Sequence, residues 1–212
     1  MARPVNADAT ATRRRVLGAA TRLFSQNGFA GTSVRSVANA AQVNVATIHH
    51  YFQSKELLYE RCVDRMYEDL SGLRAELLPR LASHGDRPQA VVDLVVTAGY
   101  RFAREHRASL RLLMRTVIDR GEMDAQRRDE HQMPQLERAA ELLGSLVERP
   151  RHELQLALQS VVHLVVRYAL STERELLAIA ALPEETIDPH PYVEEHLKSA
   201  ARSLLGLQEI PS

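Results

Sequence analysis

The chain has 212 residues, and its 27 basic and 27 acidic side chains give a formal net charge of zero. A chain of this length can bury a substantial core, and the balanced total indicates no nucleic-acid, membrane or acidic partner. The charge is nevertheless unevenly distributed. Residues 1–55 carry a net charge of +6, because only Asp8 opposes Arg3, Arg13, Arg14, Arg15, Arg22, Arg35 and Lys55. An N-terminal segment of this charge points to a polyanionic partner.

Composition also bears on where the protein works. The single cysteine, Cys62, excludes an internal disulfide and fits a reducing compartment. The longest apolar runs are interrupted by Asp93 and His163 and are much shorter than the roughly 20 residues of a membrane span. The N-terminal residues lack the apolar stretch of a secretory signal. We therefore expect a cytoplasmic protein that does not contact a membrane.

Apolar residues recur every three or four positions along nearly the whole chain, and no alternating run is long enough to predict a strand. We therefore expect an all-α fold with about nine helices. The first three helices are bounded by capping and stop signals: Asp8 to Asn27-Gly28, Thr32 or Ser33 to about Ala40, and Asn44 to about Phe52.

The remaining helices are longer. A fourth is predicted from Ser54 to a break at residues 84–86, and three more around residues 91–102, 110–117 and 136–147. Residues 119–133 are polar, and the pattern leaves open whether they form a loop or an exposed helix. An eighth helix is predicted from Leu154 to about Ala180, and a ninth carries a heptad-like seam at Val193, Leu197, Ala200, Leu204 and Leu207.

The last two predicted helices suggest a homodimer. Residues 161–166 are apolar on nearly all sides, which indicates burial on more than one face. Pairing of both helices with their symmetry mates would form a four-helix interface. Burial of both in a monomeric bundle remains the alternative. His163, inside the valine run, is most simply a buried, hydrogen-bonded neutral imidazole.

Residues 33–52, SVRSVANAAQVNVATIHHYF, have the pattern of two short helices joined by a tight turn. Apolar residues at one set of positions would face inward, and the second helix would protrude far enough to enter the major groove of DNA. Its predicted outward residues, suited to base edges, are Asn44, Ala46, Thr47, His49 and His50. The neighbouring residues suited to phosphate oxygens are Thr32, Ser33, Arg35 and Lys55.

The run RRRVLGAATRLFSQNGFAGTSVRSVANAAQVNVATIHHYFQSKELL resembles the N-terminal domain of the TetR family of bacterial transcriptional regulators over about 45 residues. The resemblance includes the Leu23-Phe24 pair, Gly28, Thr32, Val37-Ala38, Ala41-x-Val43 and Phe52-x-Ser54-Lys55-Glu56. It implies that the helix with Thr47 to His50 is the recognition helix and that Lys55 anchors the DNA backbone. It further implies a DNA-binding domain at residues 1–53 and a helical ligand-binding and dimerisation domain at residues 54–212.

Two positions depart from the family pattern. Gln42 stands in the turn where relatives usually have glycine, so it must either adopt an unfavourable backbone angle, at a cost on the order of 1 kcal/mol, or the turn must differ. His49 stands where relatives usually have a tyrosine whose hydroxyl contacts phosphate. An imidazole would bind phosphate better when protonated, so we expect operator affinity to rise as the pH falls toward about 6.

We therefore expect a homodimeric repressor of double-stranded operator DNA that a small-molecule inducer releases. The candidate ligand-lining residues are Met66, Tyr100, Met114 and His163, since each interrupts or enriches an apolar face. One alternative is a ligand-independent DNA-binding or scaffold protein whose C-terminal domain only dimerises. The third hypothesis is an enzyme, but the sequence shows no recognisable combination of catalytic residues. We expect no cofactor and no metal, because the nine histidines lack ligand spacing.

Overall fold

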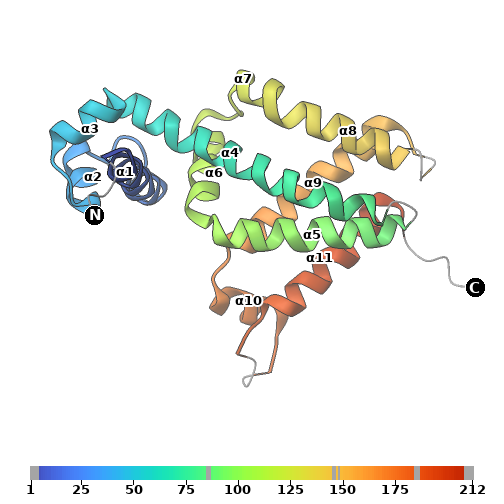
Figure 1. The fold of residues 1–212 in the computed structure, drawn as a ribbon. Helices are drawn as coiled ribbons and strands as arrows, with labels where there is room; N and C mark the ends of the chain where they lie inside the picture. The colour runs from blue at the N-terminus through green and yellow to red at the C-terminus, as the bar shows by residue number, and fades with distance from the viewer. Residues whose placement is uncertain (1–4, 85–86, 145–146, 148, 184–186, 208–212) are drawn as a thin grey trace, which may run out of the picture. The chain divides into compact units, whose positions relative to one another are not determined.

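A computed structural model of the chain describes residues 5–84, 87–144, 147, 149–183 and 187–207, and these residues form helices joined by turns and irregular segments (Figure 1). The expected all-α fold is confirmed. Arg3, counted above, and the predicted break at Gly85-Asp86 lie outside the described residues. Within the described residues no single helix is long and apolar enough to cross a membrane; the helices Arg151–Leu170 and Glu173–Ala180 meet that criterion only as a pair, and they are bent by 115°.

The chain divides into two compact units, which are described separately below. The first comprises residues 1–71 and 108–122, and the second comprises residues 72–107 and 123–212. This division falls inside one long helix instead of after residue 53. The physical reason is that Leu58, Cys62 and Leu112 are buried in the same core as the N-terminal helices. Burial raises the pKa of the Cys62 thiol to about 11, so the thiol stays protonated.

The first unit contains α1 (Val5–Asn27), α2 (Val34–Ala41), α3 (Val45–Phe52), the first part of α4 (Lys55–Ala82) and α6 (Arg107–Arg120). Helix α1 begins three residues before the predicted start at Asp8 and is followed by Gly28, whose φ of 74° forms a left-handed cap. Phe24, Ile48 and Leu58 are fully buried at the centre of this unit. The core therefore fixes the positions of α2 and α3.

The second unit contains α5 (Pro88–Glu105), α8 (Met133–Gly144), α9 (Arg151–Leu170), α10 (Glu173–Ala180) and α11 (His190–Leu205). Helix α9 packs against α5, α8 and α11. The segment that the sequence left open, residues 119–133, is mostly helical: α6 ends at Arg120, and α7 (Ala125–Arg127) and the π-helical η1 (Arg128–Gln132) lead into α8.

The prediction of one continuous helix from Leu154 to Ala180 is wrong, because the chain turns at Ser171-Thr172. The Thr172 hydroxyl oxygen accepts a hydrogen bond from the Glu175 N–H and so caps α10. At the end of α9, the guanidinium of Arg107 donates to the carbonyl oxygens of Leu170 and Ser171, at 3.1 and 2.7 Å. Both broken ends therefore have hydrogen-bond partners.

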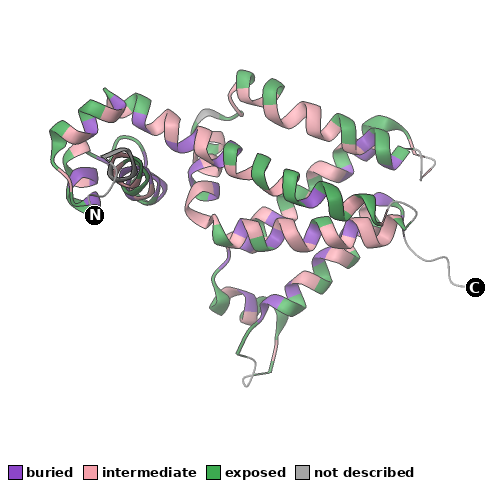
Figure 2. Ribbon diagram, viewed as in Figure 1, coloured by how far each residue is buried: buried purple, intermediate pink, exposed green. Residues whose placement is uncertain are grey.

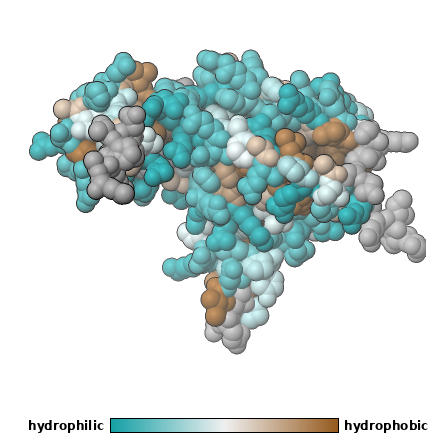
Figure 3. Space-filling model, in the orientation of Figure 1, coloured by the Kyte–Doolittle hydropathy of each residue, from teal (hydrophilic) through white to brown (hydrophobic). Residues whose placement is uncertain are grey.

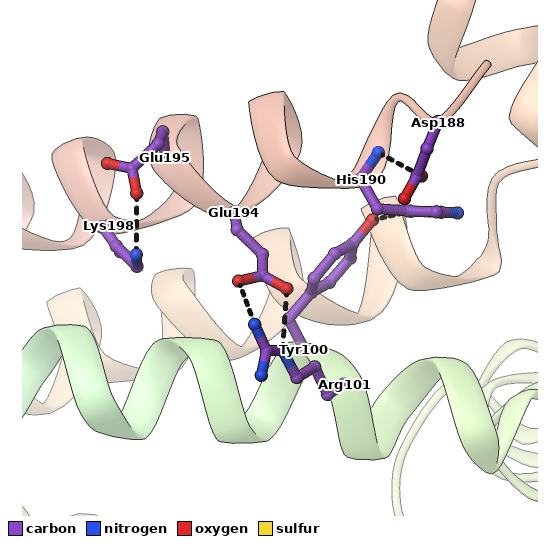
Figure 4. Close-up of polar contacts among 7 residues, drawn as sticks. All are labelled: Tyr100, Arg101, Asp188, His190, Glu194, Glu195 and Lys198. Atoms are coloured by element: carbon purple, nitrogen blue, oxygen red, sulfur yellow. Dashed lines mark hydrogen bonds and ion pairs between the residues drawn. The ribbon is translucent and has the colours of Figure 1, made fainter.

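Helices α5 and α11 are joined by side chains shown in Figure 4. The Tyr100 hydroxyl and His190 Nδ1 are 2.8 Å apart and buried, and Arg101 binds Glu194 through two nitrogen–oxygen contacts of 3.0 and 3.1 Å. Burial raises the pKa of Tyr100 to about 12, and burial together with the nearby Arg104 lowers the pKa of His190. The pair is therefore uncharged near neutral pH.

Each of the last two long helices has a buried and an exposed side, which alternate in Figure 2. In α9 the exposed side includes Leu156, Val162 and His163, so the expectation of a buried His163 is wrong; its Nε2 lies 2.8 Å from Gln159 Nε2 at the surface. In α11, Val193 and Leu197 are buried within the protomer. Leu207 of the predicted heptad seam is buried as well, whereas Ala200 and Leu204 are half-buried, so the seam packs internally only in part.

Candidate nucleic-acid interface

The residues before α2 form a reciprocal cap. The Ser33 hydroxyl oxygen accepts from the Ser36 N–H at 3.0 Å, and the Ser33 N–H donates to the Ser36 hydroxyl oxygen at 3.1 Å. The cap sets the start of α2, whose residues Val37 and Ala38 point into the core. The Ser33 side chain is exposed and only accepts in this cap, so its O–H remains available to a phosphate.

The turn between α2 and α3 uses the left-handed conformation at Gln42. Its φ of 53° and ψ of 49° give the first of the two outcomes expected for a non-glycine residue here. The Gln42 and Val43 N–H groups donate to the carbonyl oxygens of Asn39 and Ala38, at 3.2 and 3.0 Å. These hydrogen bonds end α2 and aim the chain into α3.

Asn44 caps α3 as expected. Its Oδ1 accepts from the Thr47 N–H at 2.7 Å and from the Thr47 hydroxyl at 2.8 Å. Thr47 is half-buried and its O–H is already donated, so Asn44 and Thr47 are partly committed to the fold. Asn44 is an exposed residue, and its Nδ2 group makes no hydrogen bond to a described residue.

The exposed residues of α3 form a single stripe. Ile48 and Phe52 anchor the helix in the core, whereas Ala46, His49 and His50 are exposed. Their spacing of three and four residues places them on one helical face. Ala46 is short and His50 makes no hydrogen bond to a described residue, so this face can approach the base edges of a duplex.

His49 is held by the residue that follows α3. Its Nδ1 lies 3.0 Å from the carbonyl oxygen of Gln53, which has a φ of 63°. Because a carbonyl oxygen only accepts, Nδ1 must carry the proton in this contact. Neutral His49 then has a lone pair on Nε2, and only the protonated ring can donate from Nε2 to a phosphate. Sequence reasoning missed Gln53, because its contribution comes from the backbone carbonyl and an unusual φ.

The predicted phosphate-contacting residues occupy different environments. Arg35 is exposed on α2, and Lys55 begins α4 with its Nζ 4.2 Å from the centre of the Phe29 ring. Thr32 requires a correction: it is only 2% exposed and its hydroxyl donates to the Gly28 carbonyl oxygen at 2.9 Å. The Thr32 side chain stabilises the turn after α1 and is not available to donate to DNA.

One cation that sequence reasoning did not assign lies at the C-terminal end of α3. The Arg13 guanidinium carbon is 5.8 Å from the centre of the Phe52 ring, and Phe52 is the last residue of α3. The signal in the sequence was the Arg13-Arg14-Arg15 run, but the pattern did not show which arginine lies beside α3.

The four candidate ligand-lining residues are divided between the units. Met66 and Met114 belong to the first unit, and Tyr100 and His163 to the second. Met66 and Tyr100 have no exposed surface, as expected for packed core residues, and His163 lies on the outer surface. Met66 and Tyr100 therefore present no surface to a ligand in this conformation. Met114 is half-buried.

Comparisons with known proteins agree with this geometry. Residues 16–62 match the family model described as bacterial regulatory proteins, tetR family. The chain is 33% identical over 106 residues to the probable HTH-type transcriptional regulator YttP of Bacillus subtilis, covering 50% of each chain. It is 34% identical over 84 residues to the HTH-type transcriptional repressor NicS of Pseudomonas putida, covering 40% of this chain and 38% of NicS. The chain thus spans about half the length, or less, of these curated relatives.

A solved structure shares the fold over nearly the whole chain. The TetR-like transcriptional regulator from Rhodococcus sp. RHA1 aligns with a TM-score of 0.62 and 21% identity, covering 97% of this chain and 99% of that one. The match to the family model covers α2, α3 and the start of α4, where the exposed stripe lies. Residues 16–62 therefore match the tetR family of bacterial regulatory proteins, and the chain as a whole shares the fold of a TetR-like regulator.

Proposed function

We propose that the protein is a homodimeric transcriptional repressor that binds a specific double-stranded operator and is released from it by a small-molecule inducer. The observation that carries the proposal is the exposed face of α3. Ala46, His49 and His50 project from a helix whose opposite side is anchored by Ile48 and Phe52. Such a helix is positioned to read base edges in a major groove, while flanking cations contact the phosphates.

The assignment of roles follows the environments of the side chains. His50 and Ala46, with the free amide group of Asn44, are the proposed base-reading groups, and Thr47 supports them through the cap. Ser33, Arg35, His49 and Lys55 are the proposed phosphate contacts. Residues that contact phosphate hold the protein on any duplex, whereas residues that contact base edges determine which duplex is preferred.

Dimerisation is supported by the exposed sides of α9 and α11. Leu156 and Val162 on α9 and Tyr192 on α11 are 68%, 48% and 54% exposed, and apolar side chains of this size favour burial against a second protein surface. The Tyr168 hydroxyl lies 3.3 Å from His196 Nε2, so the two helices contact each other near this surface. A twofold partner would place two copies of α3 in successive major grooves, about 34 Å apart or a multiple of that.

Release by a ligand is proposed without assigned lining residues. Helix α4 begins at Lys55, soon after α3 ends at Phe52, so a change in its tilt would alter the separation of the two α3 helices. To switch the protein from mostly bound to mostly released, an inducer must favour the released conformation by on the order of 5 kcal/mol. The complete burial of Met66 and Tyr100 favours the second candidate, a DNA-binding protein whose C-terminal unit only dimerises.

The experiment that tests DNA binding is selection from a randomised duplex library with the full-length protein. The proposal predicts enrichment of one palindromic motif with half-sites spaced by about 34 Å or a multiple. Equal retention of all sequences would contradict it. A screen of small molecules for release of that duplex then separates the two candidates, since a true inducer both releases DNA and raises the melting temperature of the free protein.

A further inference from the structure

The Arg13 side chain beside the end of α3 differs from two arginines further along α4 in the same unit. Arg61 and Arg65 on α4 are paired with the carboxylates of Asp64, Glu68 and Asp69. Arg13, on α1, is exposed and forms no ion pair with a carboxylate of the described residues. An arginine left without an acidic partner is available to an external anion.

The position of Arg13 is nevertheless fixed. Its guanidinium carbon lies 5.8 Å from the centre of the Phe52 ring, and Phe52 is 3% exposed and ends α3. The guanidinium contacts the ring through its positive charge, and this contact does not require its N–H groups to donate a hydrogen bond. Within the described residues the five N–H donors of Arg13 have no acceptor, so they are available for a bidentate contact with phosphate oxygens.

Lys55 shows the same arrangement on the following helix. Its Nζ lies 4.2 Å from the centre of the Phe29 ring, and Lys55 is three residues after Phe52 in the chain. Two cations, each held against an aromatic ring, therefore flank the C-terminal end of α3. In a duplex that accepts α3 in its major groove, the phosphates bordering the groove are the anions nearest to the ends of the helix.

We propose that Arg13 is a DNA-backbone anchor, positioned by Phe52, that donates to a phosphate oxygen without reading sequence. This inference rests on the proposed function. It adds to the interface a residue of α1, which lies outside the helix-turn-helix segment.

The test compares Arg13→Met with Arg80→Met in full-length protein. Methionine retains an unbranched side chain that packs on the Phe52 ring but removes the charge. Arg80 is an exposed arginine of α4 in the second unit and supplies the matched control. Dissociation constants are measured for the selected operator duplex and for a random-sequence duplex, at KCl concentrations from about 50 to about 200 mM.

We expect Arg13→Met to weaken both duplexes by the same factor and to reduce the slope of log Kd against log[KCl]. The reduction should be about 0.9 for each phosphate that the variant no longer neutralises, which is about 1.8 for a dimer. Arg13→Lys should recover most of the slope, and Arg80→Met should retain all of it. A melting temperature for Arg13→Met equal to that of the wild type shows that the fold is intact.

A wild-type slope in Arg13→Met would overturn this inference while leaving the proposed function in place. A loss of affinity that follows a lowered melting temperature, with an unchanged slope, would also overturn it and assign Arg13 a structural role. Failure of the wild-type protein itself to bind either duplex would overturn the proposed function and this inference together.

Discussion

At the scale of single residues, His49 replaces a phenol with a group whose donor capacity depends on pH. Its Nδ1 proton is used by the Gln53 carbonyl oxygen at 3.0 Å, so the Nε2 of the neutral ring presents a lone pair to the phosphate backbone. Protonation converts Nε2 into a charged donor. The direction of the pH effect expected from the sequence is therefore unchanged, and the structure supplies its atomic cause.

The prediction is that operator affinity rises as the pH is lowered from about 8 to about 6. Binding titrations at fixed salt measure it. His49→Tyr should bind with little pH dependence, because a phenol hydroxyl donates throughout this range. His50→Gln serves as the control. If the pH effect disappears in His50→Gln but persists in His49→Tyr, the effect comes from His50 and the prediction is wrong.

At the scale of elements, the turn between α2 and α3 carries backbone strain at Gln42, whose φ is 53°. Gln42→Gly should raise the free energy of unfolding by about 1 kcal/mol, since the left-handed penalty of about 1–2 kcal/mol exceeds the entropic cost of glycine in the unfolded chain. Ala40→Gly, at an exposed position inside α2, should instead lower it by about 1 kcal/mol. Urea unfolding of both variants measures the difference, and destabilisation by Gln42→Gly would contradict the strain.

The junction between α5 and α11 sets a pH dependence of stability. Burial, and then Arg104, lowers the pKa of His190, whereas Asp188 and Glu173 raise it less. The folded protein therefore binds fewer protons at this site than the unfolded chain does, whose imidazole titrates near 6.5. This contribution to stability is present above pH about 6.5 and is lost as the pH falls below that value.

We therefore expect the wild type to lose more unfolding free energy than His190→Gln between pH about 8 and pH about 5.5, at equal protein concentration. Glutamine retains an acceptor for the Tyr100 hydroxyl but does not titrate. His196→Gln, at an exposed histidine of the same helix, should behave as the wild type does. Equal losses of unfolding free energy in all three proteins would show that folding does not lower the pKa of His190.

The elements also show what the sequence could specify. The sequence was sufficient to predict the caps at Ser33 and Asn44 and the glycine at position 28, because local hydrogen bonds and backbone angles determine these features. The break between α9 and α10 was missed, although Thr172-x-x-Glu175 is a capping signal, because the apolar period continues through it. The partner that satisfies the end of α9 is Arg107, which is distant in sequence, and periodicity carries no information about such contacts.

At the scale of the molecule, the sequence predicted the outward face of α3 because an anchored helix must alternate between core and solvent. It did not predict that α6 shares the core of the N-terminal helices, since burial of Leu112 with Phe24 depends on tertiary packing. The sequence could not distinguish the candidate ligand-lining residues from core residues for the same reason. Met66 and Tyr100 occur in amphipathic patterns that fit a cavity wall and a packed core equally well.

Assembly is the second property of the whole molecule. Apolar side chains also reach the surface over α10, where Ile179 is 60% exposed (Figure 3). If the exposed side of α9 is the dimer interface, Leu156→Glu should give a folded monomer with weakened operator binding, because a buried unpaired carboxylate opposes association. Ile118→Glu, at an exposed position of α6, should remain dimeric. Sedimentation velocity distinguishes these outcomes, and a stable dimer of Leu156→Glu would place the interface elsewhere.

The proposed function depends on α3 reading DNA through its exposed face. The most direct measurement is the sequence preference, obtained by duplex selection, of His50→Ala compared with Lys55→Ala. We predict that His50→Ala changes the preferred bases at specific positions, whereas Lys55→Ala weakens binding to all duplexes alike and lowers the salt slope. An unchanged motif with His50→Ala, or the same altered motif with both variants, would contradict the assignment of base reading to α3.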